Sequence, residues 1–187
     1  GLAPKPGTAY KDRTNIGDAV NTGIEIYTEF DIINAMKEKA KQQLFVFVNA
    51  AYIQSYYLRS KEPNYIGKQV EYVAPLIVRG GLKYKVKNWS SQFQVSYTSE
   101  QYSDASNAVI PSGDAVIGLV PSYFIMDFST RYEWKYNLSF ELSFNNLTNQ
   151  KYFTRRASGY PGPGILPSDG IQFFGTLQYK FSQKRKS

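Results

Sequence analysis

The sequence contains no cysteine and no histidine among its 187 residues. Their absence excludes thiol catalysis, Cys/His zinc sites, disulfide bonds and Ser-His-Asp triads. No apolar run approaches the roughly 20 residues that a transmembrane helix needs, which excludes a helical membrane protein. We therefore expect no enzyme activity, no catalytic residue, no metal ligands and no cofactor in this chain.

An initiating methionine is also missing, and residues 1–7 (GLAPKPG) read as the middle of a loop. They have neither the charged region nor the apolar region of a signal peptide. We interpret the sequence as a fragment of a longer protein.

The basic residues are in excess but dispersed. Lys and Arg number 22 against 15 Asp and Glu, a net charge of +7 that would suit nucleic acid, an anionic membrane or an acidic small ligand. Part of the excess lies in the terminal residues 184–186, while Arg79, Lys83 and Lys85 alternate with apolar residues. No basic helix or stripe forms, so nucleic acid is not an expected partner.

Apolar and polar residues alternate with a period of two, as in strands with one apolar and one polar face. The pattern predicts strands over residues 22–33, 44–57, 76–86, 89–97, 123–134, 137–144 and 171–181. Only the second leaves its register open, because residues 44–48 are apolar on both faces.

Long and short connections alternate between these strands. The long ones are 58–75, 99–122 and 152–170; the tight turns are 87–88 and 135–136; residues 34–43 are intermediate and could hold a helical turn. Outer-membrane barrels have this arrangement, with long loops outside the cell and short turns in the periplasm.

Aromatic residues near strand ends suit the interfacial girdles of such a barrel. They are Tyr56, Tyr57, Tyr84, Trp89, Tyr97, Tyr123, Tyr132 and Trp134. A soluble β-sandwich also alternates apolar and polar residues, but the Gln, Ser, Glu and Lys on nearly every strand fit a wet lumen better. Seven is an odd number, so these strands alone cannot close a standard bacterial barrel. The predicted fold is all-β: a transmembrane antiparallel β-barrel, of which this chain is one part.

Motifs at several positions resemble TonB-dependent outer-membrane receptors. Asn145, Asn146, Leu147 and Tyr152 lie in NNLTNQKYF, which is similar to a segment near the end of that family, and Phe181 resembles the end of its closing strand. Residues 73–84 resemble its proline-led strand, and 21–25 resemble another strand start. Together the motifs cover nearly the whole chain.

Residues 155–170 (RRASGYPGPGILPSDG) resemble the final extracellular loop of receptors of the ferric dicitrate type. The resemblance implies a plugged barrel of about 22 strands in the bacterial outer membrane. Residues 1–181 would be its C-terminal portion, and 182–187 a short basic tail. The implied partners are outer-membrane lipid, a small-molecule iron chelate, and the TonB-ExbB-ExbD complex, which acts through an upstream plug that this chain does not include.

Arg155 and Arg156 are the candidate ligand-binding residues. Ferric citrate is a small polyanion, and Arg grips carboxylates with two parallel hydrogen bonds. We expect at least one of the two to face the ligand; the alternative is that both pair with neighbouring loops. Gly159, Pro161 and Gly162 are expected to shape a rigid turn.

Other polar residues are given structural roles. Asn145 and Asn146 are expected to satisfy backbone groups where the strand bends, and Ser168 and Asp169 to cap the loop. Glu25, Glu29 and Asp31 form a row on one strand face. We expect this row to face cations of a nearby strand, such as Arg79, Lys83 or Lys85, rather than a metal.

Three alternatives to ferric chelate import stay open. A barrel of the same type could import another siderophore, a vitamin or a glycan. A structural or adhesive barrel would have no transport role. The last alternative is a soluble β-rich binding module.

Overall fold

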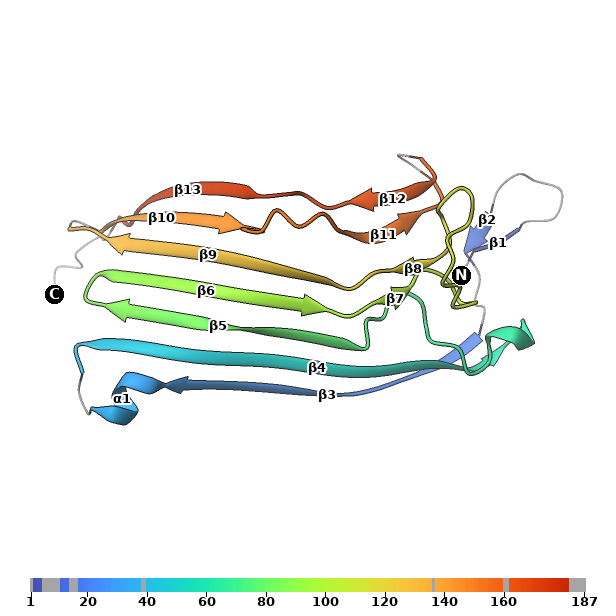
Figure 1. The fold of residues 1–187 in the computed structure, drawn as a ribbon, viewed down its shortest axis with the longest axis horizontal. Coiled ribbons are helices and arrows are strands. Elements are labelled where there is room, and N and C mark those ends of the chain that lie inside the picture. Colours follow the sequence, from blue (N-terminus) through green and yellow to red (C-terminus); the bar gives the residue numbers. More distant parts are fainter. Residues whose placement is uncertain are drawn as a thin grey trace.

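The computed structural model describes residues 2–4, 11–13, 17–37, 40–135, 137–159 and 162–181. Its main feature is one antiparallel sheet of seven strands, in which each strand bonds to the next along the chain (Figure 1). The strands are β3 (Gly17–Asp31), β4 (Gln42–Ser60), β5 (Leu76–Val86), β6 (Trp89–Thr98), β9 (Tyr123–Glu133), β10 (Leu138–Asn145) and β13 (Gln172–Tyr179). The seven predicted strands and the all-β architecture are confirmed. β3 and β13 are the sheet's two edges and are not bonded to each other, so the described sheet is open.

Short elements lie at the two ends of the sheet. Three pairs of short strands and one 3-10 turn lie at the end with the long loops: β1 (Leu2–Pro4) with β2 (Lys11–Arg13), β7 (Gln101–Tyr102) with β8 (Leu119–Val120), β11 (Phe153–Ala157) with β12 (Gly164–Pro167), and η1 (Pro63–Tyr65). The helix α1 (Ile32–Met36) lies at the opposite end. Within the described part of the chain, no helix is both long enough and apolar enough to span a membrane.

The strand pairing settles the register of β4. Val46 lies opposite Phe30 on β3 and Leu82 on β5, and Phe47 lies opposite Glu29. Directly opposed residues share a face of a sheet. Val46 therefore belongs to the apolar face, while Phe47 lies on the face that carries the charged row.

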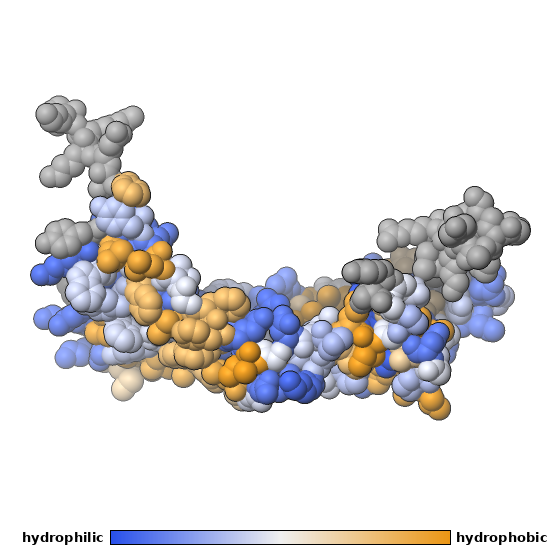
Figure 2. All heavy atoms as spheres, turned by 90° about the horizontal axis from the view of Figure 1, so that it is seen from above, coloured by the Kyte–Doolittle hydropathy of each residue, from blue (hydrophilic) through white to orange (hydrophobic). Residues whose placement is uncertain are grey.

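The apolar face is open to its surroundings. Ile24 is 62% exposed, Ile26 56% and Leu177 72%. Seen from above, over the β13 edge, the molecule is a thin curved layer with hydrophobic side chains at its surface (Figure 2). A soluble monomer rarely leaves such a large continuous apolar surface uncovered. This face therefore requires an apolar environment such as lipid.

The first connection departs from the predicted strand. Ile32 and Ile33 were predicted to continue the strand, but they lie in α1. The Asp31 carboxylate accepts a hydrogen bond from the backbone N–H of Asn34 at 3.2 Å, and this N-cap begins the helix. The helical turn predicted in this connection is confirmed, and it begins two residues before its predicted range.

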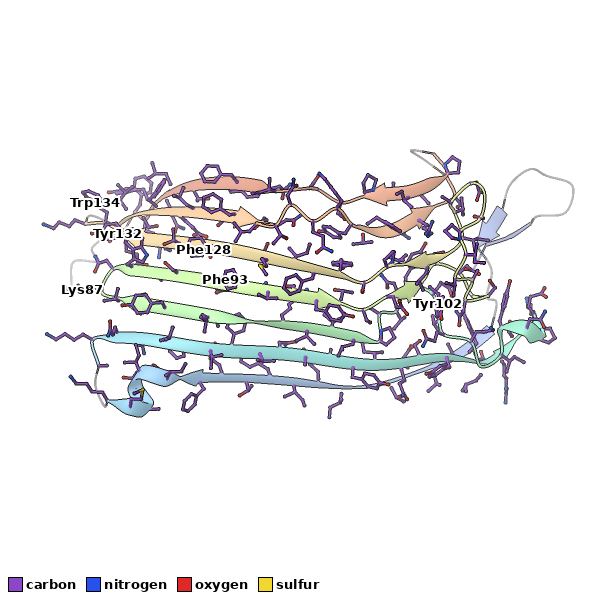
Figure 3. The ribbon with its side chains drawn as sticks, viewed as in Figure 1. Lys87, Phe93, Tyr102, Phe128, Tyr132 and Trp134 are labelled. Carbon is purple, nitrogen blue, oxygen red and sulfur yellow. The ribbon has the colours of Figure 1, made fainter. Side chains whose placement is uncertain are left out.

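Aromatic side chains gather on the apolar face at the turn end of the sheet. Trp89 and Tyr132 meet edge to face with ring centroids 5.8 Å apart, and Tyr132 and Trp134 meet at the same centroid distance. Tyr132, Trp134 and the neighbouring Lys87 all lie at this end, opposite Tyr102 (Figure 3). Tyr84 belongs to the same group, and its hydroxyl donates to Gln42 Oε1 at 2.8 Å.

Two of the predicted girdle residues are not on this face. Tyr57 is buried, and its hydroxyl donates to Glu71 Oε2 at 2.6 Å. Tyr123 alternates with the outward Phe124 and stacks on Tyr152 at 4.6 Å. The prediction was wrong for both, because a position near a strand end does not determine which face a side chain takes.

Candidate functional site at the loop end

The long loops pack together at one end of the sheet, and most of the small core lies there. Val120 is fully buried, and Ala74 and Ala105 are nearly so. Backbone contacts join the loops: the N–H of Tyr72 donates to the carbonyl of Tyr102 at 2.8 Å. We call this assembly of residues 61–75, 99–122 and 146–171 the loop end.

Arg156 is buried and joins β11 to the loop of residues 99–122. It lies on β11, opposite Ile165 of β12. Its Nη1 donates to the carbonyl of Ala115 and its Nη2 to the carbonyl of Leu119, both at 2.8 Å. The guanidinium also lies 5.1 Å from the ring centroid of Phe153. Within the described residues, this buried cation has neutral acceptors and no ion pair, so its positive charge is not neutralised.

Arg155 is the neighbouring cation and is exposed. Its guanidinium lies 5.8 Å from the ring centroid of Tyr72. The Tyr72 hydroxyl donates to the carbonyl of Arg156 at 3.0 Å, which fixes the ring that supports Arg155. Across the part of the chain that the structure describes, Arg155 has no acidic partner. Its fork of N–H donors is therefore available to a carboxylate or another anion.

Tyr72 is a residue that the sequence did not single out. Its φ is 58°, a left-handed conformation that non-glycine residues adopt infrequently. Neither this conformation nor its contact with a loop more than eighty residues away leaves a local pattern. A half-buried aromatic ring that supports an arginine could be found only from the structure.

Asn146 joins the ends of two strands to the last loop. Its side chain donates to the carbonyl of Gln150 at 3.0 Å and of Asp169 at 3.3 Å, and accepts from the N–H of Gln150 at 2.9 Å. Its own N–H donates to Asp127 Oδ1 at 2.9 Å, and its φ is 52°. It is 3% exposed. This residue of the motif therefore organises the backbone rather than presenting a surface to solvent.

The other motif residues surround this hub. Asn145 pairs with Gln172 of β13, and the N–H of Leu147 donates to the carbonyl of Met126 at 2.8 Å. The Tyr152 carbonyl accepts from the N–H of Ser168 at 2.9 Å. Phe181 follows β13 and is 90% exposed. Its ring centroid lies 4.6 Å from that of Tyr179.

The glycine-rich turn is described in part. The N–H of Gly162 donates to the carbonyl of Gly159 at 2.7 Å, and Gly164 has φ +135°. Pro161 and Tyr160 lie outside the described residues, as does the predicted tail at 182–187. The assigned roles of the turn and of the tail stay predictions.

A pocket of about 460 Å³ lies beside the Asn146 hub. Its polar lining comes from Asp127, Asn145, Ser168, Asp169 and Gln172. None of the described residues that line it is basic. The pocket therefore suits hydroxyl, amide or cationic groups better than carboxylates.

The polar face of the sheet carries paired charges nearer the turn end. Lys83 Nζ lies 2.5 Å from Glu29 Oε2, and Arg131 Nη1 lies 3.6 Å from Glu141 Oε2. Glu25 accepts from Asn49 Nδ2 at 3.2 Å. The prediction that the carboxylate row faces a nearby cation is confirmed for Glu29 and Lys83. Among the described residues, no three acidic side chains come close enough together to hold a metal ion.

The sheet is antiparallel, with one face suited to lipid and one polar face, and it has short turns at one end and long loops at the other. These features together define a segment of a transmembrane β-barrel. A sequence model of the family described as TonB dependent receptor-like, beta-barrel matches residues 2–147. The chain belongs to this family, which consists of outer-membrane receptors and not of enzymes. In barrels of this family the long loops are extracellular and the short turns are periplasmic.

Solved structures share the fold. They include the ferric citrate transporter FecA in the unliganded form, with a TM-score of 0.76 and 20% identity over 85% of this chain and 24% of that one. The siderophore receptor PiuA from Acinetobacter baumannii has a TM-score of 0.65 and 22% identity, over 89% of this chain and 22% of its own. The copper transporter OprC has a TM-score of 0.69 and 14% identity, over 96% and 27%. This chain spans about a quarter of the length of these proteins.

Proposed function

We propose that this chain is the C-terminal barrel portion of a TonB-dependent receptor that imports a ferric chelate of the carboxylate type, such as ferric citrate. The main support is the pair of cations at the loop end. Arg155 is exposed without an acidic partner among the described residues, and the Arg156 guanidinium donates to two neutral carbonyl oxygens. An anionic chelate would find there both a positive potential and a free guanidinium fork.

The two arginines have different parts in this proposal. Arg155 contacts the chelate directly, through carboxylate oxygens. Arg156 holds the loop of residues 99–122 against β11 and contributes its charge from beneath the surface. Import would then be driven by the TonB-ExbB-ExbD complex, through a plug encoded outside this chain.

The test is ligand binding to the full-length receptor purified in detergent. Ferric dicitrate is titrated against iron-free citrate and an unrelated siderophore. R155A should weaken ferric dicitrate binding by about tenfold or more, because a charged hydrogen-bonding group is lost. K151Q, which removes an exposed cation from the same loop, is the matched control and should bind as the unaltered receptor does. Equal binding by R155A and the unaltered receptor would contradict the assigned contact.

The acidic pocket supports a second candidate, a receptor for an uncharged polyhydroxyl ligand such as a glycan. Asp127 and Asp169 would accept hydrogen bonds from hydroxyl groups there, and Tyr152 offers an aromatic surface. The same titration separates the two candidates. A receptor that ignores ferric dicitrate but binds an oligosaccharide, with binding lost in D169N and retained in R155A, would favour the second.

A further inference from the structure

Positive charge is concentrated in the periplasmic connections of this chain. The three short connections, residues 32–41, 87–88 and 134–137, contain five Lys and one Glu. The three long loops, residues 61–75, 99–122 and 146–171, contain five basic and six acidic residues despite their much greater length. The asymmetry does not depend on the ligand contact proposed for Arg155, which lies at the loop end.

Four of these lysines are described and exposed: Lys37, Lys41, Lys87 and Lys135. We call them the basic rim. Every one of the three connections contributes, so the rim extends across the turn end of the sheet from β3 to β10. Lys180 is left out, because it continues the alternation of β13 on the polar face.

Two acidic residues next to the rim, both in the described part of the chain, are already engaged. Asp31 accepts from Asn34 through both carboxylate oxygens, at 3.2 and 2.6 Å, and caps α1. Glu133 lies 3.7 Å from Arg131 Nε. Among the described residues, no member of the rim has an ion pair. The rim thus keeps its net positive charge.

The aromatic group fixes the depth of the rim in the membrane. Trp89, Tyr132 and Trp134 are exposed on the apolar face at this end, where aromatic rings mark the interface between hydrocarbon and headgroups. Lys87 lies two residues before Trp89, and Lys135 directly follows Trp134. Lys87 and Trp134 both lie at the turn end (Figure 3). Long lysine side chains reach from such positions into the headgroup layer.

We propose that the basic rim binds the anionic headgroups of phospholipids in the periplasmic leaflet, phosphatidylglycerol being the simplest. Each lysine near an anionic surface contributes about a fivefold preference for it. A surface that gathers several lysines from three turns holds several lipid phosphates at once. The rim thereby fixes the height of the barrel at the periplasmic interface.

The experiment counts lipids that remain bound to the full-length receptor in detergent by native mass spectrometry, with phosphatidylglycerol and phosphatidylcholine supplied in turn. The quadruple variant K37Q/K41Q/K87Q/K135Q should lose bound phosphatidylglycerol by about fivefold or more. The corresponding Lys→Arg variant should retain it. The control K61Q/K68Q/K151Q removes exposed cations from the extracellular loops and should retain it as well.

Several results would overturn the proposal. One is equal retention of the two lipids by the unaltered receptor, and another is unchanged phosphatidylglycerol binding in the quadruple variant. Capture of a periplasmic protein that needs the rim, with lipid binding unchanged, would replace a lipid partner by a protein one. If the quadruple variant fails to fold, as judged by its mobility in unheated gels, the variants K37Q/K41Q and K87Q/K135Q test the same claim separately.

Discussion

Lys83 reaches across β4 to Glu29: its Nζ lies 2.5 Å from Glu29 Oε2 and 4.7 Å from the ring centroid of Phe47 between them. The two charged residues are on strands that are not neighbours, so the ion pair ties together three strands. Phe47 is only 6% exposed, although it lies on the polar face. A charged pair thus covers an aromatic ring that would otherwise be exposed to water in the lumen.

Removal of the Phe47 ring should lower the free energy of unfolding more than removal of the Lys83–Glu29 ion pair. F47A should lower the free energy of unfolding of the receptor by about 3 kcal/mol, because a buried aromatic side chain is lost. K83M should have a much smaller effect, since half-exposed ion pairs are screened by water. Denaturant unfolding in detergent, followed by tryptophan fluorescence, measures both. A larger loss in K83M than in F47A would show that the charge and not the ring stabilises this part of the barrel.

The two faces of the sheet should respond oppositely to a new charge. F128K places a cation on the apolar face, in the middle of β9, and should reduce stability by about 2–4 kcal/mol or prevent insertion. S129K places the same cation one residue further on, on the polar face, and should be tolerated. Folding into lipid vesicles, scored by gel mobility with and without heating, distinguishes the variants. Equal insertion of both would contradict the assignment of the faces.

Loss of the Asn146 side chain should loosen the last loop. N146A removes three side-chain hydrogen bonds and places a less suitable residue at φ 52°, so we expect a loss of about 2 kcal/mol. Cleavage of residues 146–171 by a protease should become faster. The control T148A changes an exposed residue of the same segment and should leave cleavage unchanged. Equal cleavage of N146A and the unaltered receptor would rule out this role.

Hydrogen exchange should separate the two arginines. R156A removes both bonds to the carbonyls of Ala115 and Leu119, so amides of residues 111–119 should exchange faster. R155A removes no such bond and should leave the exchange of this segment as it was. Faster exchange in R155A alone would mean that the contact between β11 and this loop has been assigned to the wrong arginine.

Much of the barrel could be predicted from the sequence because its strands meet water on one face and lipid on the other. This contrast gives the period of two that located all seven strands. β4 was the exception. Phe45 and Phe47 lie on its polar face, and the Lys83 that covers Phe47 comes from a strand more than thirty residues away. Apolar residues on both faces erase the periodicity from which register is inferred.

The loop end could be predicted only in part. The sequence singled out Arg155 and Arg156 but could not distinguish them, because the acceptors of Arg156 are backbone carbonyls about forty residues away. Every residue has a backbone carbonyl, so the amino-acid sequence does not show which carbonyls accept a hydrogen bond from an arginine. The helical turn was expected only from residue 34 onward for a related reason. The alternating pattern continues past Asp31, but the Asp31 carboxylate accepts from the N–H of Asn34 and so begins the helix at Ile32.

An isolated chain should not be stable in water. β3 and β13 are open edges, and residues such as Ile24 and Leu177 expose the apolar face. Open edges and apolar faces drive association between copies. We expect aggregation without detergent, measured by sedimentation. A soluble monomer that unfolds cooperatively would contradict the membrane assignment of the apolar face.

The most direct test of a TonB-dependent receptor for ferric chelates is uptake of radiolabelled iron, supplied as ferric dicitrate, by cells that produce the full-length receptor. The account predicts uptake that stops when TonB is deleted and that falls about tenfold or more in R155A, with the amount of receptor in the outer membrane unchanged. Uptake that is the same with and without TonB, or the same in R155A and the unaltered receptor, would contradict it.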